Sequence, residues 1–112
     1  MISYYTGSRR KNGDAHMFVD GEPLPLRLDL QRHSPDGFEW GYMGSGPAQT
    51  ALAILAHHLK NDALAVELHQ HYHHEVVARA ARQLWSTNTN EIDVWLGKQL
   101  ARPDHLEIRR MS

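Results

Sequence analysis

The chain has 112 residues, and its 12 Lys and Arg against 13 Asp and Glu give a formal net charge of −1. This length is close to the commonest size of one domain, and the hydrophobic share of 41% is typical of a globular protein. The balanced charge argues against a strongly basic nucleic-acid binder, because such proteins gain affinity by neutralising phosphates. We therefore expect a single domain over residues 1–112 that does not bind nucleic acid.

The chain contains no cysteine, which excludes disulfides, thiolate catalysis and Cys-based zinc or iron–sulfur sites. The first residues, Met-Ile-Ser-Tyr-Tyr, have no basic region and no long apolar run, so no signal peptide is predicted. The longest strongly apolar stretch, residues 51–56, is far too short to cross a bilayer. These features predict a bacterial cytoplasmic protein with no membrane association.

The first third of the chain, residues 1–42, is predicted to be mainly β. The third candidate strand, residues 22–30, carries leucine at every second position from Leu24 to Leu30. This spacing points one face of the strand at a core. Pro23 and Pro25 each remove a hydrogen-bond donor from it, so it is either an edge strand or an irregular arm. Turn signals and β-rich runs predict up to four strands, at residues 2–5, 15–19, 22–30 and 38–42.

The hydrophobic period changes to that of a helix after Gly44. We expect Gly46 to cap the first helix, with Pro47 at its first position and Gln49 reaching back to the cap. Asp62 is expected to cap the second helix, and Thr89 or Asn90 the third. Helices are predicted at residues 47–59, 62–84 and about 90–101, followed by a short strand or a frayed end at 106–112. The predicted fold is α+β, a small antiparallel N-terminal sheet of three to four strands packed against about three C-terminal helices, with residues 47–101 mainly α.

The run from Phe38 to Gln49 reads F-E-W-G-Y-M-G-S-G-P-A-Q. It resembles a family of small uncharacterised bacterial and phage proteins built around the phrase F-E-W-G-Y-x-G-S-G-P-A-Q. That family continues with an Ala/Leu-rich helix, an aromatic residue in a second helix and a Trp near its end, here Tyr72 and Trp85. The chain departs from the family pattern at Met43 and in its histidine-rich tract. The resemblance implies an accessory gene of phages, plasmids or other mobile elements, and it carries no activity.

A glycine-rich loop precedes the first predicted helix. Backbone N–H groups and the helix dipole at such a position favour a phosphate or carboxylate. Against this, Pro47 removes one donor, and neither a P-loop lysine nor a G-x-G-x-x-G spacing is present. A tight turn is the favoured interpretation, with the Glu39 carboxylate accepting N–H groups at the helix start. The candidate ligand-binding residues are Gly44, Ser45, Gly46, Glu39 and Trp40.

Histidine is abundant, with nine residues in all and four of them in the tract 69–74. His69 and His73 are four apart and share one face of a helix. His58, near the end of the preceding helix, supplies a third ligand if the two helices form a hairpin. This set predicts a divalent metal such as zinc or nickel, and with it a metal-assisted hydrolase. A solvated face is the favoured alternative, and a pH-sensitive or partner-facing surface is the third.

No complete catalytic set stands out in the sequence. Arg9, Arg10 and Lys11 form a basic cluster in a predicted loop that suits a phosphate or an acidic protein surface. Our first hypothesis is a non-enzymatic protein-interaction module, in its most specific form an anti-defence factor that inhibits a CRISPR complex or a restriction system. The alternative is a small-ligand or metal-binding domain, with a hydrolase among its forms. A protein partner is expected in the first case, and a homodimer is left open.

Overall fold

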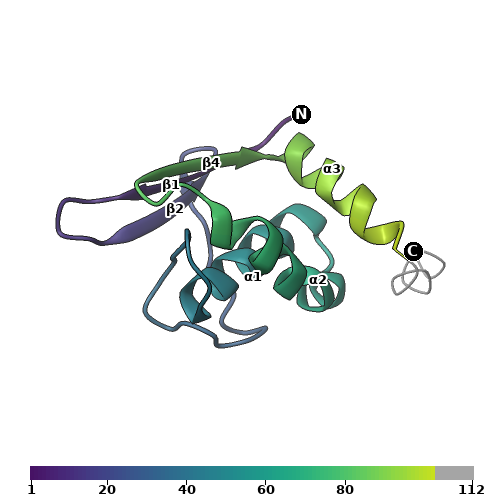
Figure 1. Cartoon of the computed structure of the whole chain (residues 1–112), viewed down its shortest axis with the longest axis horizontal. Helices are drawn as coiled ribbons and strands as arrows, with labels where there is room; N and C mark the ends of the chain where they lie inside the picture. Colours follow the sequence, from purple (N-terminus) through teal and green to yellow (C-terminus); the bar gives the residue numbers. More distant parts are fainter. Residues whose placement is uncertain (103–112) are drawn as a thin grey trace.

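The computed structural model describes residues 1–102. The helices and strands, in chain order, are β1 (Tyr4–Arg9), β2 (Ala15–Val19), β3 (Glu22–Pro23), α1 (Ser45–Leu59), α2 (Asp62–Glu75), the 3-10 turn η1 (Val77–Arg79), β4 (Leu84–Asn88) and α3 (Thr89–Leu100). The predicted α+β fold is confirmed, because a four-stranded antiparallel sheet packs against helices (Figure 1). The short strand or frayed end predicted at residues 106–112 lies outside the described residues. Within residues 1–102 no helix combines the length and apolar character needed to cross a bilayer.

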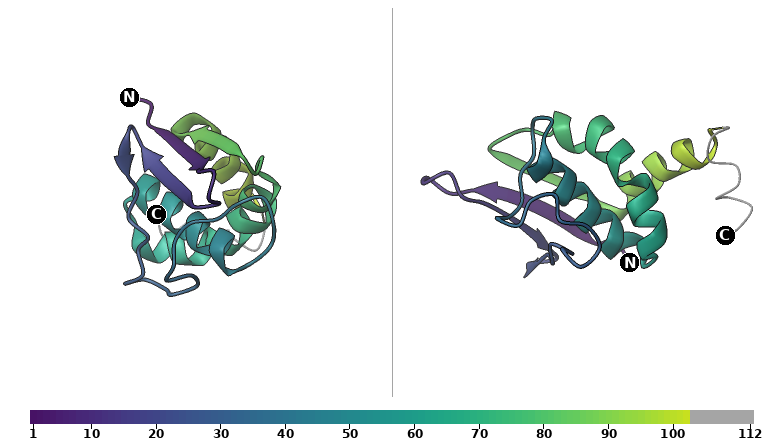
Figure 2. Two further views of the ribbon diagram at one scale, coloured as in Figure 1. Left: turned by 90° about the vertical axis from the view of Figure 1, so that its left-hand side faces the viewer. Right: turned by 90° about the horizontal axis from the view of Figure 1, so that it is seen from below.

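The sheet has the strand order β3-β2-β1-β4, and β1 pairs antiparallel with both of its neighbours. Its side chains alternate between two faces, as the pleat requires. Tyr5 and Gly7 of β1, Met17 and Val19 of β2, and Thr87 of β4 are buried on the face that the helices cover. The helices α1 and α2 lie together on that side of the sheet (Figures 1 and 2). The opposite face therefore carries the alternate residues of each strand.

Helix α1 is the centre of the core. Its residues are buried without a break from Gly46 to Ala56, as expected for a helix that is apolar nearly all round. Lys60, in a left-handed conformation, ends it, and the Asn61 side chain then accepts the N–H of Leu64 to start α2. The two helices pack against each other as a hairpin. Ala65, Leu68 and Tyr72 bring the buried face of α2 into the same core cluster.

The N-cap residues of all three helices lie one or two positions upstream of the predicted ones. Gly44, not Gly46, precedes the first turn of α1, and it makes no side-chain cap hydrogen bond. Asn61 rather than Asp62 caps α2, and Asn88 rather than Thr89 or Asn90 caps α3 by accepting the N–H of Glu91. In both cases an asparagine one or two residues upstream is the residue whose side chain reaches the free N–H groups.

Gln49 does not reach back to the cap of α1, contrary to the prediction. Its side chain is fully buried, and its amide donates to the carbonyl of Leu26 at 2.7 Å. Its Oε1 accepts the N–H groups of His33 and Ser34. Gln49 thus fixes the long segment between β3 and α1 by satisfying backbone groups that have no sheet partner. That segment is an irregular arm after Pro23, which is the second of the two predicted alternatives.

The fourth strand is Leu84–Asn88, and the predicted strand at residues 38–42 is wrong. Gly41 takes a positive φ of 88°, which a strand does not allow. The N–H of Glu39 donates to Thr50 Oγ1, and that of Gly41 to the carbonyl of Val77. The alternation of Phe38, Trp40 and Tyr42 therefore does not reflect strand pairing.

The second helix stops at Glu75, nine residues before its predicted end at Leu84. The sequence from Val76 to Leu84 favours a helix by composition, yet it forms the turn η1, a bent connection and the start of β4. The carbonyls of Ala81 and Arg82 accept the indole N–H of Trp40, each at 3.0 Å. In a helix through this segment, those carbonyls would instead accept hydrogen bonds from N–H groups of the helix itself. The tertiary contact with Trp40 therefore overrides the local helix propensity.

Substitution of two glycines tests this packing. In Gly7→Ala the added methyl would lie 2.7 Å from Met17 Sδ and 2.8 Å from the Trp40 ring. We expect a loss of about 1–3 kcal/mol in the free energy of unfolding from overpacking. Gly97→Ala is the matched control, because Gly97 lies inside α3 with no heavy atom within 4 Å of the new methyl. This control should gain about 0.5–1 kcal/mol from helix propensity. Urea unfolding measures both, and equal effects would contradict the packing described here.

Candidate functional site

Arg9 and Glu39 form a paired ion bridge between β1 and the glycine loop. Arg9 Nη1 and Nη2 donate to the two carboxylate oxygens of Glu39 at 3.0 and 2.8 Å. The hydrogen-bonded carboxylate raises the pKa of Arg9. The guanidinium also lies 5.1 Å from the centre of the Trp40 ring, which favours a cation there. The Arg9 side chain is therefore engaged in contacts within the fold. The other two predicted interaction residues, Arg10 and Lys11, are exposed at the turn after β1.

Trp40 is the largest fully buried side chain. Its indole N–H donates to two carbonyls before β4, and its ring lies 6.4 Å from that of Trp85 on β4. The adjacent Gly41 allows the chain to turn, since a side chain there would meet Arg82 as well as require a positive φ. Glu39 and Trp40, predicted as ligand-binding residues, thus connect the loop to β1 and β4.

Side chains of this chain pack against Gly44 and Gly46, whereas Ser45 between them is exposed. A methyl on Gly46 would lie 2.7 Å from the Glu39 Cβ, and one on Gly44 would lie 3.1 Å from the Tyr42 ring. The N–H of Gly44 donates to His73 Nε2 at 3.3 Å. The glycines therefore permit close packing, and an anion site at this helix start stays a prediction.

The predicted metal residues occupy two separate places. His69 and His73 lie on α2 and are 2% and 4% exposed, and the nearest imidazole to His69 is His33, with Nε2 atoms 2.9 Å apart. His58 instead lies 2.6 Å from Asp93 on α3. Among residues 1–102 no three or more His, Asp or Glu side chains gather as a metal site would need. His33, in the arm before α1, gave no sequence signal, because it lies 36 residues from His69.

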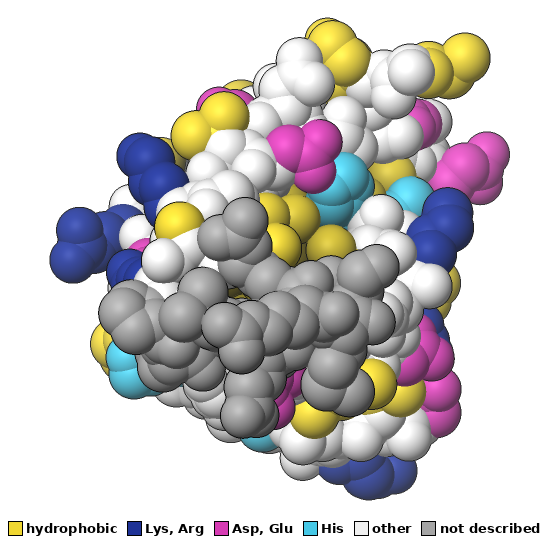
Figure 3. Space-filling model, turned by 90° about the vertical axis from the view of Figure 1, so that its right-hand side faces the viewer, with side chains coloured by type: hydrophobic (Ala, Val, Ile, Leu, Met, Phe, Trp, Pro, Cys, Tyr) yellow, Lys and Arg dark blue, Asp and Glu magenta, His cyan; other side chains and the backbone are white. Residues whose placement is uncertain are grey.

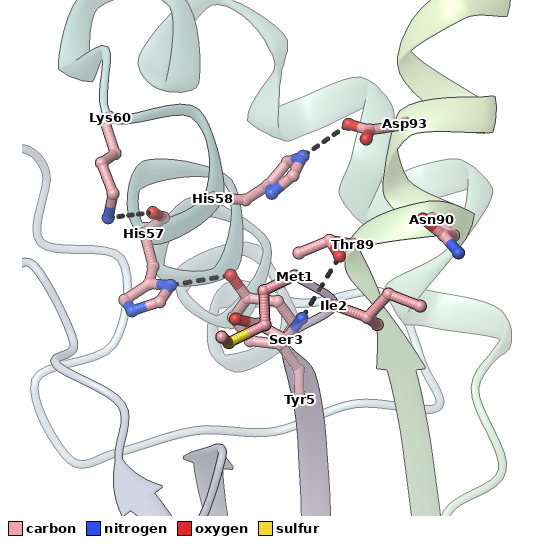
Figure 4. Close-up of a pocket in the computed structure, with 10 residues that line it drawn as sticks. All are labelled: Met1, Ile2, Ser3, Tyr5, His57, His58, Lys60, Thr89, Asn90 and Asp93. Atoms are coloured by element: carbon pink, nitrogen blue, oxygen red, sulfur yellow. Dashed lines mark hydrogen bonds and ion pairs between the residues drawn. The ribbon is translucent and has the colours of Figure 1, made fainter.

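An open pocket of about 430 Å³ lies where the end of α1 meets the starts of β1 and α3 (Figure 4). Tyr5 Oη is 2.7 Å from His57 Nδ1, and Lys60 Nζ donates to the His57 carbonyl. Burial raises the pKa of Tyr5 to about 12 and lowers that of His57. A phenol that holds its proton and a weakly basic imidazole make a poor acid–base pair near pH 7. We interpret this pair as a contact that holds α1 on the sheet.

The outer side of β4 has no neighbouring strand within the described residues. Thr89 N–H donates to the Ser3 carbonyl at one end of the β1–β4 ladder. Hydrogen-bonded pairs recur at every second residue of an antiparallel ladder. The backbone N–H and C=O groups of Thr87 and Trp85 therefore also point toward β1. The N–H and C=O groups of Leu84 and Ser86 then point away from the sheet. We call these outward groups of Leu84 and Ser86 the β4 edge.

The sheet face next to the β4 edge is turned away from the helices (Figure 2). Tyr4 and Leu84 on this face are 54% and 64% exposed, although both are large apolar side chains. Thr6 and Ser86, directly paired across β1 and β4, lie between them in the register. Elsewhere, at the α3 end, side chains of both charge signs are interspersed over the described surface (Figure 3). Tyr4 and Leu84 are thus two exposed apolar side chains on the face beside the β4 edge.

The Glu39–Arg9 bridge should contribute measurably to stability, because its side chains are only 29% and 12% exposed. Glu39→Gln removes the charge and one acceptor while Arg9 stays in place, and we expect a loss of about 1–3 kcal/mol in the free energy of unfolding. The matched control is Asp29→Asn, which weakens another paired arginine bridge whose carboxylate is 64% exposed. That change should cost under about 1 kcal/mol. Equal losses in urea unfolding would show that burial of the bridge is unimportant.

The buried histidines predict that the protein loses stability in mild acid. Burial lowers the pKa of His57, His69 and His73. The unfolded chain therefore binds more protons than the folded chain below about pH 6.5, so stability falls as the pH drops through that value. The lowered pKa values of Asp20 and Asp29 act in the same direction only near pH 4 and below.

Urea midpoints at pH 7.5 and pH 5.5 measure this effect. We expect the midpoint to be lower at pH 5.5, and the difference to shrink in His69→Gln because one buried imidazole is removed. His74→Gln, at an exposed position of the same tract, is the matched control. A protein that is more stable at pH 5.5 than at pH 7.5 would contradict the burial of neutral imidazoles.

Comparison with known proteins gives a family and no activity. No curated protein matches the chain, and no solved structure matches it either. A family model described as a family of unknown function, DUF6166, matches residues 5–98. The match contains the whole sheet apart from Tyr4, the core helices α1 and α2, and nearly all of α3. The chain therefore belongs to DUF6166, a family of unknown function.

Proposed function

We propose that the protein is a non-enzymatic interaction module that binds an extended segment of a partner protein along the β4 edge. The observation that carries the proposal is the difference between the two edges of the sheet. At one edge, β3 has only two residues, and one of these is Pro23. At the other, β4 has five residues, Leu-Trp-Ser-Thr-Asn, with neither proline nor charge.

An unprotected strand edge is a template for another strand, and proteins usually protect it with proline, charge, a bulge or a very short strand. The β3 edge has two of these protections. The β4 edge has none in the described residues, because its register against β1 runs without a bulge from Asn88 to Leu84. An edge kept in this form is suited to strand addition, in which main-chain hydrogen bonds supply the affinity.

The side chains beside the β4 edge supply a basis for specificity. Leu84 pairs with Ser8 and Tyr4 pairs with Asn88, so the two exposed apolar groups stand at opposite ends of the outer face. The small side chains of Thr6 and Ser86 leave space between them. A segment added to β4 would place alternate side chains over this face. Its apolar residues would then contact Leu84 at one end.

The size of the β4 edge sets the strength of binding. A ladder against a five-residue strand is short, and interfaces below about 1,200 Å² are typical of weak or transient complexes. We therefore expect a dissociation constant in the micromolar range, which corresponds to about −8 kcal/mol, unless the partner also contacts the helices. Reversible binding of this kind suits an accessory or inhibitory protein.

In its most specific form the proposal places the protein among mobile-element accessory factors, with a CRISPR or restriction complex as the partner. Its support is the resemblance of the F-E-W-G-Y-x-G-S-G-P-A-Q phrase to phage and bacterial proteins. Expression in a host that carries such a defence system should raise phage plaque counts. Unchanged plaque counts against every defence system of the native host would remove this form and leave the general proposal standing.

A pair of matched substitutions tests the general proposal. Leu84→Lys places a charge beside the β4 edge and should abolish capture of the partner from native-host lysate, because a charged edge disfavours strand addition. Val94→Lys is the control, since Val94 is 61% exposed against 64% for Leu84 but lies on α3. Capture with a tag other than polyhistidine and mass spectrometry measure both. A partner that is retained equally by the two variants would contradict binding at the β4 edge.

A further inference from the structure

The outward backbone groups of β4 are arranged symmetrically about Ser86. Leu84 lies two residues before Ser86 and Asn88 two residues after it, and all three occupy alternate positions of the register against β1. In an antiparallel ladder, residues at alternate positions direct their N–H and C=O groups to the same side of the strand. This side of β4 is therefore complementary to an inverted copy of itself, because each Ser86 can donate its N–H to the C=O of the other.

We propose that a second copy of this chain pairs antiparallel with β4 about a two-fold axis at Ser86 and thereby masks the β4 edge. The inference rests on the same open edge as the proposed function, and it names the regulation of that edge. A two-fold contact uses one patch on both copies, so a single self-complementary strand is sufficient. The four-stranded sheets of the two copies would become continuous across the axis.

On the face that the helices cover, this register places Trp85 of one copy beside Thr87 of the other. Such a pair has no hydrogen bonds between its backbones, and its side chains approach more closely than those of the hydrogen-bonded pairs. Trp85 is half-buried in the single chain, whereas Thr87 is buried. Pairing would therefore remove further indole surface from water, once on each side of the axis. An aromatic residue beside a β-branched one is also a favourable cross-strand pair.

On the outer face, the register brings together two exposed apolar side chains that lie apart within one copy. Leu84 and Tyr4 stand at opposite ends of this face, because Leu84 pairs with Ser8 and Tyr4 with Asn88. In the antiparallel dimer, Leu84 of one copy stands opposite Asn88 of the other and so enters the row that contains Tyr4. The dimer therefore offers these apolar groups a proximity that the single chain does not.

Charge does not oppose this self-pairing. None of the five residues of β4 is charged, and charged side chains are a usual protection of strand edges against self-association. Beyond the strand, Arg82 of one copy would lie near the start of α3 of the other, where Glu91 stands. Both side chains are exposed, and the two-fold axis repeats the approach. Opposite charges thus flank the paired strands at both ends.

The interface is small, and so the dimer is weak. Each copy contributes one five-residue strand, and small interfaces are typical of transient complexes. We expect a dissociation constant on the order of 100 μM, which is weaker than the micromolar binding expected of the partner. In dilute solution the chain is then a monomer with an open β4 edge. At high local concentration the second copy covers the edge until a tighter partner displaces it.

Sedimentation velocity of the full chain tests the inference, over concentrations from about tenfold below to about tenfold above the expected dissociation constant. We expect the weight-average mass to rise from one chain toward two. Ser86→Pro should abolish the rise, because it removes the outward N–H at the axis and no hydrogen bond to β1. Ser86→Thr, which keeps that N–H, is the matched control and should dimerise as the parent does. Circular dichroism confirms that each variant is folded.

Hydrogen exchange gives a second readout that needs no variant. In the parent, the amides of Leu84 and Ser86 should gain protection between dilute and concentrated solution, while that of Trp85, which faces β1, should change little. The inference is wrong if the folded parent stays monomeric over the whole range or if folded Ser86→Pro dimerises with parental affinity. Dimerisation that leaves the exchange of Leu84 and Ser86 unchanged would equally overturn it.

The same measurements separate this inference from the proposed function. A parent that stays monomeric, yet captures a partner in a manner that Leu84→Lys abolishes, refutes the dimer and leaves the proposed function standing. A dimer that Ser86→Pro abolishes, in a chain that captures no partner from lysate, supports the inference and counts against the proposed function.

Discussion

The burial of Trp40 determines how the sheet and the helices of this protein come together. Its indole N–H needs acceptors inside the protein, and the carbonyls of Ala81 and Arg82 supply them. This requirement keeps residues 81 and 82 out of a helix and so brings β4 beside β1. Gly7 leaves the space that the ring occupies, because any side chain there would contact it. Arg9 lies over the same ring while bound to Glu39, which connects the sheet to the glycine loop.

The surface for binding follows from this arrangement. With β4 placed at the end of the sheet by Trp40, its outer backbone groups have no strand to pair with in the described residues. The same side of the protein carries the exposed Tyr4 and Leu84. The F-E-W-G-Y-M-G-S-G-P-A-Q run therefore contributes to the fold that presents the β4 edge, and it is not itself the proposed binding surface. The contact between His33 and His69 lies elsewhere, where the arm meets α2.

Local patterns predicted the parts of the fold that depend on local energetics. The alternation of β2 and the apolar composition of α1 each correspond to a single element, and the hairpin of α1 and α2 follows from the break at Lys60 and Asn61. The alternation of Phe38, Trp40 and Tyr42 was misleading, because residues 38–42 form no strand and Trp40 is buried through contacts with residues distant in the sequence. Leu84–Asn88 was missed because three of its five residues, Ser86, Thr87 and Asn88, are polar, a composition that resembles a loop.

The candidate sites were only partly predictable for the same reason. His69 and His73 stood out because they lie one helical turn apart, and the structure confirms that they share a face of α2. Their neighbour His33 comes from the irregular arm, and its position depends on the buried amide of Gln49. The β4 edge depends on the pairing of β4 with β1, whose residues lie about 80 positions apart in the chain. No periodicity within one segment carries such information.

Amide hydrogen exchange of the isolated protein tests the central claim most directly. If the β4 edge is open, the amides of Leu84 and Ser86 exchange rapidly while those of Trp85 and Thr87, which face β1, are protected. This alternation should disappear when the partner binds, because strand addition protects Leu84 and Ser86 as well. Equal protection of all four amides in the isolated protein would show that the edge is already covered, and it would contradict the account.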